Sequence, residues 1–265
     1  MKKFTVEVLY PEIANLYGDL ANIRYLKRTL GEDCEVRETG LKARPLFLDE
    51  PETVDLVYLG TMTESSQRIV IDRLMPHRSE IRDRIEQGQR FLVTGNALEV
   101  FGKEIVDDRT SCLTDCDGNV IRVDVSGMPE EKFHTKALGI FDFHTTRDML
   151  HRYNSLYLGK YGELDVVGFK SQFTQSYYDG TPEPLFQTTR GPGLNRDIKE
   201  EGIRHGNFMA TYVIGPLLIL NPMLMTKMLA EAGWEGVTPA LEDAAMDAYR
   251  ARLKEYSDPE CGFEY

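Results

Sequence analysis

The sequence predicts an α/β protein, a three-layer sandwich with a mostly parallel sheet and an antiparallel edge. Three observations support this prediction. Before about residue 104, short apolar strands alternate with helical segments. Two of these strands run into turns of small residues, Gly60-Thr61 and Thr94-Gly95-Asn96. Later in the chain, alternating strands are separated by turns. Strands that alternate with helices form parallel sheets, because each crossover places a helix on a face of the sheet.

The first half of the chain supplies the predicted parallel sheet. Residues 4–10 (FTVEVLY) alternate as a strand, and the helix that follows has apolar residues every three or four positions up to residue 30. Asp19 complements the dipole at the start of this helix, and Gly31 ends it. The later elements are strands at 34–40 and 55–60, a helical stretch from 64 to 88 that is broken at Pro76, and a strand at 91–93.

The second half of the chain supplies the predicted antiparallel strands and two closing helices. Strands are expected within 155–161, 163–179 and 184–191. The apolar, β-branched run 208–222 predicts a core strand, and residues 223–233 and 240–256 predict helices. No linker divides the chain, so a single domain over 1–265 is expected, with a core of about 4–233 and a helical extension at 239–256.

Composition and charge exclude several classes of protein. Apolar residues make up 42% and charged residues 28% of the 265, as is usual for a globular protein. The net charge of −12 argues against nucleic-acid binding, which needs a basic surface. No apolar run approaches the ~20 residues that span a bilayer. The N-terminal residues pass directly into a strand pattern, so we expect a cytoplasmic protein with reduced thiols and no membrane span.

No metal and no other cofactor is expected. Cys112 and Cys116 form a CxxxC pair without a second pair of ligands. DCDGN (115–119) has some features of a calcium loop but lacks its spacing and its closing Glu. Asp117-Gly118 is instead typical of a hairpin turn.

The two small-residue turns raise the question of an active site. Ligands of parallel sheets bind at the carboxyl ends of the strands, so both turns are expected to face one crevice. FLVTGNALEVFGK (91–103) has the strand, tight turn and helix of a nucleophile elbow. Its turn contains Thr94, Gly95 and Asn96, and neither Ser nor Cys.

Five longer motifs occur along the chain in a fixed order. They are NLYGDLANI (15–23), DLVYLGTMTESSQ (55–67), GNALEVFGK (95–103), LGIFDFHT (138–145) and GNFMATYVIGPLLILNP (206–222). Together they resemble the class I glutamine amidotransferase domains of the cobyric acid synthase (CobB/CobQ) type, and most of all the glutaminase subunits of lipid II isoglutaminyl synthases. The resemblance covers roughly residues 5–232. It implies the flavodoxin-like class I glutamine amidotransferase fold and a partner protein that resembles Mur ligases.

The resemblance fails at the two positions that carry the family's chemistry. Aligned on Gly102-Lys103, the family's nucleophilic cysteine corresponds to Gly95, and aligned on Gly215-Pro216, its histidine base corresponds to Ile214. Glycine offers no nucleophile and isoleucine moves no proton. The family's loop "ENHGG" is also replaced, by KSQFT at 170–174. This pattern is typical of a pseudoenzyme.

Other residues are candidates for binding or for a substitute chemistry. Thr94 precedes the nucleophile position; it could attack only with a base in reach, and the alternative is a hydroxyl bonded to backbone. Gly60 and Thr61 correspond to the family's oxyanion loop. Asn96 could bind a ligand or, as we expect, cap the following helix. Arg152 falls near the family's arginine for the glutamine carboxylate, or forms a surface ion pair.

Three functions follow from these observations. The first and favoured one is a non-catalytic amidotransferase-like partner of an ATP-dependent, Mur-ligase-like amidating enzyme. The second is a working glutamine amidotransferase in cobalamin or cell-wall precursor amidation, with a rearranged nucleophile. The third is a protein that binds glutamine or another small molecule in the vacated crevice.

Overall fold

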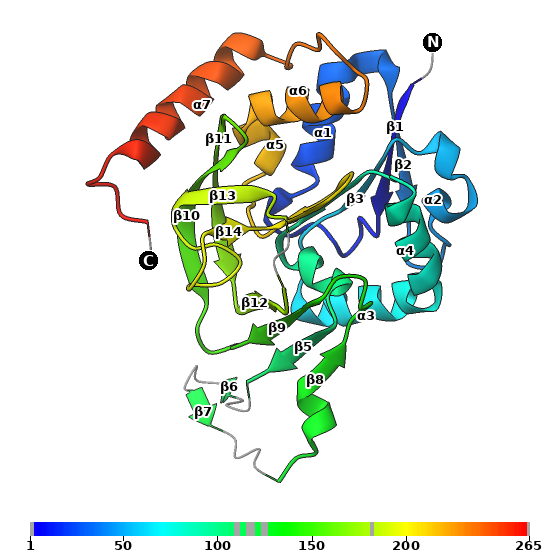
Figure 1. Cartoon of the computed structure of the whole chain (residues 1–265), viewed down its shortest axis with the longest axis vertical. Helices are drawn as coiled ribbons and strands as arrows, with labels where there is room; N and C mark the ends of the chain where they lie inside the picture. Colours follow the sequence, from blue (N-terminus) through cyan, green and yellow to red (C-terminus); the bar gives the residue numbers. More distant parts are fainter. Residues whose placement is uncertain (1–2, 109–111, 115–119, 123–126, 181–182, 264–265) are drawn as a thin grey trace.

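The computed structural model describes residues 3–108, 112–114, 120–122, 127–180 and 183–263 (Figure 1). Its central sheet has the strand order β15-β16-β4-β3-β1-β2. Within this sheet β2, β1, β3, β4 and β16 are parallel, and β15 is antiparallel at the edge. The strands are β1 (Phe4–Leu9), β2 (Cys34–Thr39), β3 (Leu56–Leu59), β4 (Phe91–Thr94), β15 (Ile203–His205) and β16 (Phe208–Thr211). The predicted α/β class with a mostly parallel sheet is confirmed.

Helices cover both faces of this sheet and divide the core into two clusters. On one face α1 (Ala21–Leu30), α5 (Leu217–Leu220) and α6 (Pro222–Glu231) enclose Val6, Val8 and Leu56. On the other face α2 (Leu46–Asp49), α3 (Glu64–Leu74) and α4 (Arg78–Glu86) enclose Val57 and Val93. Short 3-10 helices connect these elements: η1 (Leu16–Gly18), η2 (Gly31–Asp33), η3 (Pro51–Thr53), η4 (Met75–His77) and η5 (Gly95–Phe101). Because helices pack on both faces, each face of the sheet is shielded from solvent, as its apolar strands require.

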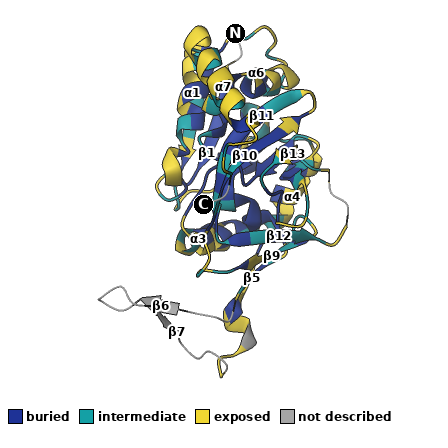
Figure 2. Cartoon of the chain, turned by 90° about the vertical axis from the view of Figure 1, so that its left-hand side faces the viewer, coloured by how far each residue is buried: buried dark blue, intermediate teal, exposed yellow. Residues whose placement is uncertain are grey.

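The remaining strands form smaller sheets of their own. The first has the order β11-β10-β13-β14, the second β12-β9-β5-β8, and β6 pairs with β7. The helix α7 (Glu242–Ser257) packs on β10 and β11, and η6 (Glu130–Phe133) precedes β8. The strands are β5 (Glu104–Asp107), β6 (Cys112–Thr114), β7 (Val120–Arg122), β8 (His134–Lys136), β9 (Phe143–Arg147), β10 (Tyr153–Tyr161), β11 (Leu164–Gln172), β12 (Thr174–Tyr178), β13 (Phe186–Arg190) and β14 (Glu200–Glu201). Figure 2 shows buried residues along β1 and β10 and exposed residues on the outer side of α7.

Two predictions about local structure are wrong. The strand expected over 208–222 ends at Thr211, and the apolar residues beyond it form α5 and the start of α6. Gly215, with φ +145°, and Pro216 turn the chain at this point. The helix expected after residue 96 is the 3-10 helix η5. The Asp117-Gly118 turn, the calcium-like loop and Cys116 lie outside the described residues, as does the side chain of Cys112.

Candidate functional site

The carboxyl end of β4 has the backbone of a nucleophile elbow. Gly95 follows the strand directly, is buried and has φ +62°, a left-handed conformation that favours glycine. A Cβ atom at this position would lie 2.4 Å from Oγ1 and 2.7 Å from Cγ2 of Thr61. The side chain of Thr61 therefore fills the space into which a side chain at residue 95 would project.

A buried carboxylate holds Thr61 in this position. Oδ2 of Asp19 accepts hydrogen bonds from the backbone N–H of Thr61 (2.9 Å), from its hydroxyl (2.7 Å) and from the hydroxyl of Thr94 (2.5 Å). Oδ1 accepts from the amide of Asn22 (2.9 Å), which also donates to the hydroxyl of Tyr58. All five side chains are buried. Asp19 thus satisfies inward-facing donors and is not an exposed acid at a helix start.

These contacts bear on two sequence-based expectations. The hydroxyl of Thr94 was expected to bond to backbone, and this is wrong, because it bonds to Asp19 and to the hydroxyl of Tyr58 (3.0 Å). The N–H of Thr61 is directed at Asp19, so an oxyanion role for it would require that bond to break. Gly60 has no space for a side chain, since a Cβ would lie 2.7 Å from the carbonyl oxygen of Ala14.

Asn96 joins the elbow to the loop that follows β3. Its Oδ1 accepts from the N–H of Met62 (3.0 Å), and its Nδ2 donates to the carbonyl oxygen of Met62 (2.8 Å). Gln67 of α3 donates to the carbonyl oxygen of Asn96 (2.7 Å). The prediction that Asn96 caps the following helix is therefore wrong, because its amide clamps a neighbouring loop.

A second buried polar network extends from η5 to β9. Glu99 accepts hydrogen bonds from Thr174 (2.6 Å), Tyr212 (3.1 Å) and Gln67 (2.8 Å). Gln67 in turn accepts from the guanidinium group of Arg147 (3.2 Å), which forms a two-bond ion pair with Asp107. Burial raises the pKa of the Glu99 carboxyl, and the three hydrogen bonds only partly oppose this.

The raised pKa of Glu99 predicts a pH dependence of stability. A carboxyl that keeps its proton to higher pH in the folded state stabilises the fold fully below its ordinary pKa, and this contribution is lost as pH rises through the folded pKa. Between about pH 5 and pH 8, the wild type should therefore lose stability relative to Glu99→Gln, which has no proton to release. Urea unfolding of both variants across this range measures the difference. A difference that is constant with pH would contradict the assignment.

Ile214 lies in the core, where the resemblance places a base. It is 1% exposed, and its backbone N–H and carbonyl oxygen both bond to Phe169 of β11, at 3.0 and 3.1 Å. The next residue along β11, Lys170 of KSQFT, is fully buried, donates to the carbonyl oxygen of Gly193 and forms an ion pair with Glu201. This side of the elbow is therefore closed by backbone pairing and by a buried ion pair.

Arg152 does not join these residues. Its side chain is exposed, and the guanidinium carbon lies 4.6 Å from the ring centre of Phe173. Its neighbour His151 pairs with Asp148 (2.6 Å). The arginine that connects to the elbow is Arg147, which sequence reasoning missed. In the sequence, Arg147 shares the phase of the apolar Phe143 in the segment FHTTR, and this alternation was the signal that could have found it.

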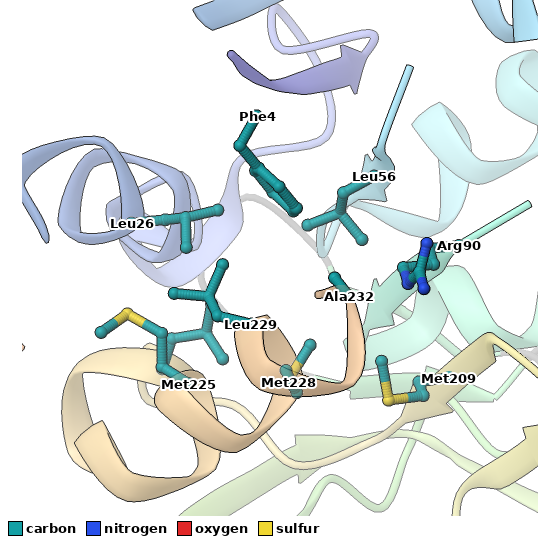
Figure 3. Close-up of a pocket in the computed structure, with 10 residues that line it drawn as sticks. Phe4, Leu26, Leu56, Arg90, Met209, Met225, Met228, Leu229 and Ala232 are labelled. Atoms are coloured by element: carbon teal, nitrogen blue, oxygen red, sulfur yellow. The ribbon is translucent and has the colours of Figure 1, made fainter. Parts of the chain in front are cut away.

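An apolar cavity lies at the opposite end of the sheet (Figure 3). Its lining includes Phe4, Leu56 and Met209 near the starts of their strands, Arg90 just before β4, and Met225 of α6. The cavity measures about 20 Å³, room for one water-sized molecule. Because parallel sheets bind ligands at the carboxyl ends of their strands, this cavity does not carry the candidate site.

The described residues contain neither a candidate metal site nor a candidate membrane span. Within the described ranges, no three His, Cys, Asp or Glu residues are grouped so that they could hold a metal ion. In the same part of the chain, no helix combines the length and apolarity needed to cross a membrane.

Comparison with known proteins gives relatives but no family model, since none matches the chain. Two curated proteins are similar to it, each named subunit GatD of a glutamine-hydrolysing lipid II isoglutaminyl synthase. The one from Staphylococcus aureus is 24% identical over 238 residues, which are 88% of this chain and 85% of the relative. The one from Streptococcus pneumoniae is 24% identical over 264 residues, 94% of this chain and 89% of the relative.

Solved structures with some likeness include two glutamine amidotransferases. One is 17% identical, with a TM-score of 0.48 over 86% of this chain and 98% of the other. The second, from Thermotoga maritima, is 11% identical, with a TM-score of 0.44 over 96% and 95%. The curated relatives show that the chain is glutamine amidotransferase-like in sequence over most of its length.

Proposed function

We propose that this chain is a glutamine amidotransferase-like subunit that no longer hydrolyses glutamine. In this proposal it acts in the cytoplasm as the non-catalytic partner of a Mur-ligase-like, ATP-dependent amidating enzyme. The observation that carries the proposal is the elbow, which has a left-handed Gly95 and no room for a side chain beside Thr61. Both curated relatives are named as subunits of an amidating synthase, which supports the choice of partner.

The chemistry of glutamine hydrolysis explains why these positions matter. A thiolate adds to the side-chain amide, and a base activates the thiol and protonates the departing ammonia. Gly95 supplies no thiolate and Ile214 no base, and the loss of either group commonly costs several orders of magnitude in rate. The position of Thr61 also argues against a ligand in the crevice, because its side chain fills the volume that a missing nucleophile would leave.

A labelling experiment tests the loss of chemistry. We expect no mass increase after incubation with a glutamine-mimicking diazoketone, because no nucleophile projects from the elbow. The measurement is intact-mass spectrometry with peptide mapping, and an active glutaminase labelled in parallel is the control. The partner ligase is included once it is known, since it could complete the site. An adduct on residues 94–96 would mean that the elbow is chemically active.

The partner is tested separately, in the native cell. Affinity purification of the tagged full chain, followed by mass spectrometry, should recover an ATP-dependent ligase of the Mur type. Glutamine-dependent amidation by the recovered complex should be absent, whereas ammonia-dependent amidation should be retained. A chain that purifies without any ligase would contradict the proposed partnership.

One observation favours a second candidate, an active amidotransferase that uses Thr94. The hydroxyl of Thr94 lies 2.5 Å from Oδ2 of Asp19, within the reach of a general base. Thr94 is fully buried, however, and the same oxygen already accepts two bonds from Thr61. If glutamine-dependent ammonia release is found, it should disappear in Thr94→Ala under this candidate, and release that survives would exclude it.

A further inference from the structure

The outer edge of the central sheet, beyond β2, has unpaired hydrogen-bonding groups. β2 pairs with β1 on one side and is the last strand of the sheet on the other (Figure 1). The carbonyl oxygen of Thr39 accepts from the N–H of Tyr10, so the backbone groups of Thr39, Arg37 and Glu35 point toward β1. The backbone N–H and carbonyl groups of Val36 and Glu38 point outward, away from β1. Among the described residues, no turn or loop forms a backbone hydrogen bond with these groups. An edge of this kind is a template for another strand.

We propose that β2 pairs with β2 of a second copy of this chain, in an antiparallel, two-fold symmetric dimer centred on Val36. Both central sheets then join into one continuous sheet. Val36 of each copy exchanges two backbone hydrogen bonds with Val36 of the other, and the N–H of Glu38 donates to the carbonyl oxygen of Cys34. The N–H of Cys34 takes no part, because it donates to Gly31 within η2.

Charge selects this partner and this register. With the two-fold axis at Val36, Glu35 lies opposite Arg37 of the other copy, as a non-hydrogen-bonded pair whose side chains are close. If the two-fold axis lay at Glu35, Glu35 would lie opposite Glu35 of the other copy, and if it lay at Arg37, Arg37 would lie opposite Arg37. Like charges opposite each other destabilise a sheet, so both of these registers are disfavoured. Within one chain Glu35 and Arg37 already pair at 2.7 Å and are only partly exposed, so they are positioned for a second partner.

The other face of the strand is complementary in the same register. Glu38, which is exposed, falls opposite Cys34 of the second copy. Burial raises the pKa of the Cys34 thiol, and the positive charge of the exposed Lys27 partly opposes this rise. Lys27 therefore lies close to Cys34. Neither Glu38 nor Lys27 forms an ion pair within the described part of the chain. The pairing therefore brings a Glu38 carboxylate to each Lys27.

The shape of the edge agrees with this arrangement. A hollow of about 420 Å³, open to solvent, lies between α1 and β2 and is lined by Ile23, Lys27, Val36 and Glu38 among others. A two-fold axis perpendicular to the sheet places the α1 helix of both copies on the same side of the joined sheet. The two hollows then meet across the Val36 pair and are partly filled by it.

The oligomeric state of the full chain tests the proposal. Sedimentation velocity and light scattering, from low to high micromolar concentration, should show a species of twice the 30.2 kDa chain mass. Arg37→Glu should weaken this dimer by about tenfold or more, because it places like charges opposite each other twice. The exchanged pair Glu35→Arg with Arg37→Glu should restore it. Arg250→Glu, the same charge change on exposed α7, should have no effect.

Two further measurements separate this interface from any other. Val36→Pro removes an outward N–H, which an edge strand tolerates, and exchanges one partly buried apolar side chain for another, so it should give a folded monomer by circular dichroism and sedimentation. Hydrogen exchange at Val36 and Glu38 should slow as concentration rises, whereas exchange at Glu35 and Arg37 should not change. A chain that stays monomeric at high concentration would overturn the proposal, as would a dimer that Val36→Pro and Arg37→Glu leave intact.

Discussion

Gly95→Ala is expected to destabilise the protein by about 3 kcal/mol. A non-glycine residue with φ near +60° costs about 1–2 kcal/mol. A Cβ at this position also lies 2.4 Å from Oγ1 of Thr61, and overpacking of this kind costs roughly 1–3 kcal/mol. Gly139→Ala is the matched control, since Gly139 has φ +61° but nothing within 4 Å of the added Cβ. This control should lose only about 1 kcal/mol.

The second substitution in this test is Thr61→Gly, which removes all three atoms nearest to the new Cβ. We expect the double variant Thr61→Gly with Gly95→Ala to be more stable than the sum of the two single changes predicts, by about 1 kcal/mol or more. Urea unfolding of the four variants measures this coupling. Equal losses for Gly95→Ala and Gly139→Ala, or additive losses in the double variant, would mean that Thr61 does not fill the elbow.

Lys170→Met is expected to cost about 3–5 kcal/mol, because it leaves the fully buried carboxylate of Glu201 without its cation. The double variant with Glu201→Gln should recover about half of this loss. Glutamine removes the charge but still offers an oxygen to the hydroxyl of Thr211 and the N–H of Tyr212, which both donate to Glu201 at 2.8 Å. Urea unfolding of the wild type, Lys170→Met and the double variant at neutral pH measures these losses.

A matched control exists for this prediction too. Lys160 of β10 pairs with Asp165 of β11 at 2.9 Å in the same sheet, but both side chains are at least a third exposed. Lys160→Met should therefore change the free energy of unfolding far less than Lys170→Met does, because an exposed ion pair contributes little. If Lys170→Met costs no more than this control, the buried pair does not stabilise the fold in the way that its burial indicates.

Three of the parallel strands were predicted well, because each is a largely apolar segment next to helical segments. Residues 4–9, 56–59 and 91–94 could be placed from periodicity alone. The prediction failed where one apolar run forms first a strand and then a helix. Ile214 and Leu217 look like a continuation of the strand before them, but Gly215-Pro216 turns the chain and pairs Ile214 with Phe169. That pairing depends on a partner far away in the sequence, which a local pattern does not contain.

The candidate site was predictable in position but not in its contacts. The two small-residue turns do meet, because β3 and β4 are neighbouring parallel strands that end at the same edge. What fills the site was not predictable. Asp19 was read as a helix-dipole residue, yet it bonds to Thr61 and Thr94 from inside the core. Arg147 reaches Gln67 only once β9 has been placed.

The place of β16 in the central sheet has a consequence for how the protein is made. β4 pairs with β3 on one side and with β16 on the other, and β16 follows β4 by more than a hundred residues. While the ribosome is still synthesising the intervening sheets, β4 has an open apolar edge, Phe91 to Thr94, to which other nascent chains can add. Folding should therefore finish late, and a chaperone that shields this edge during translation should raise the yield of native protein.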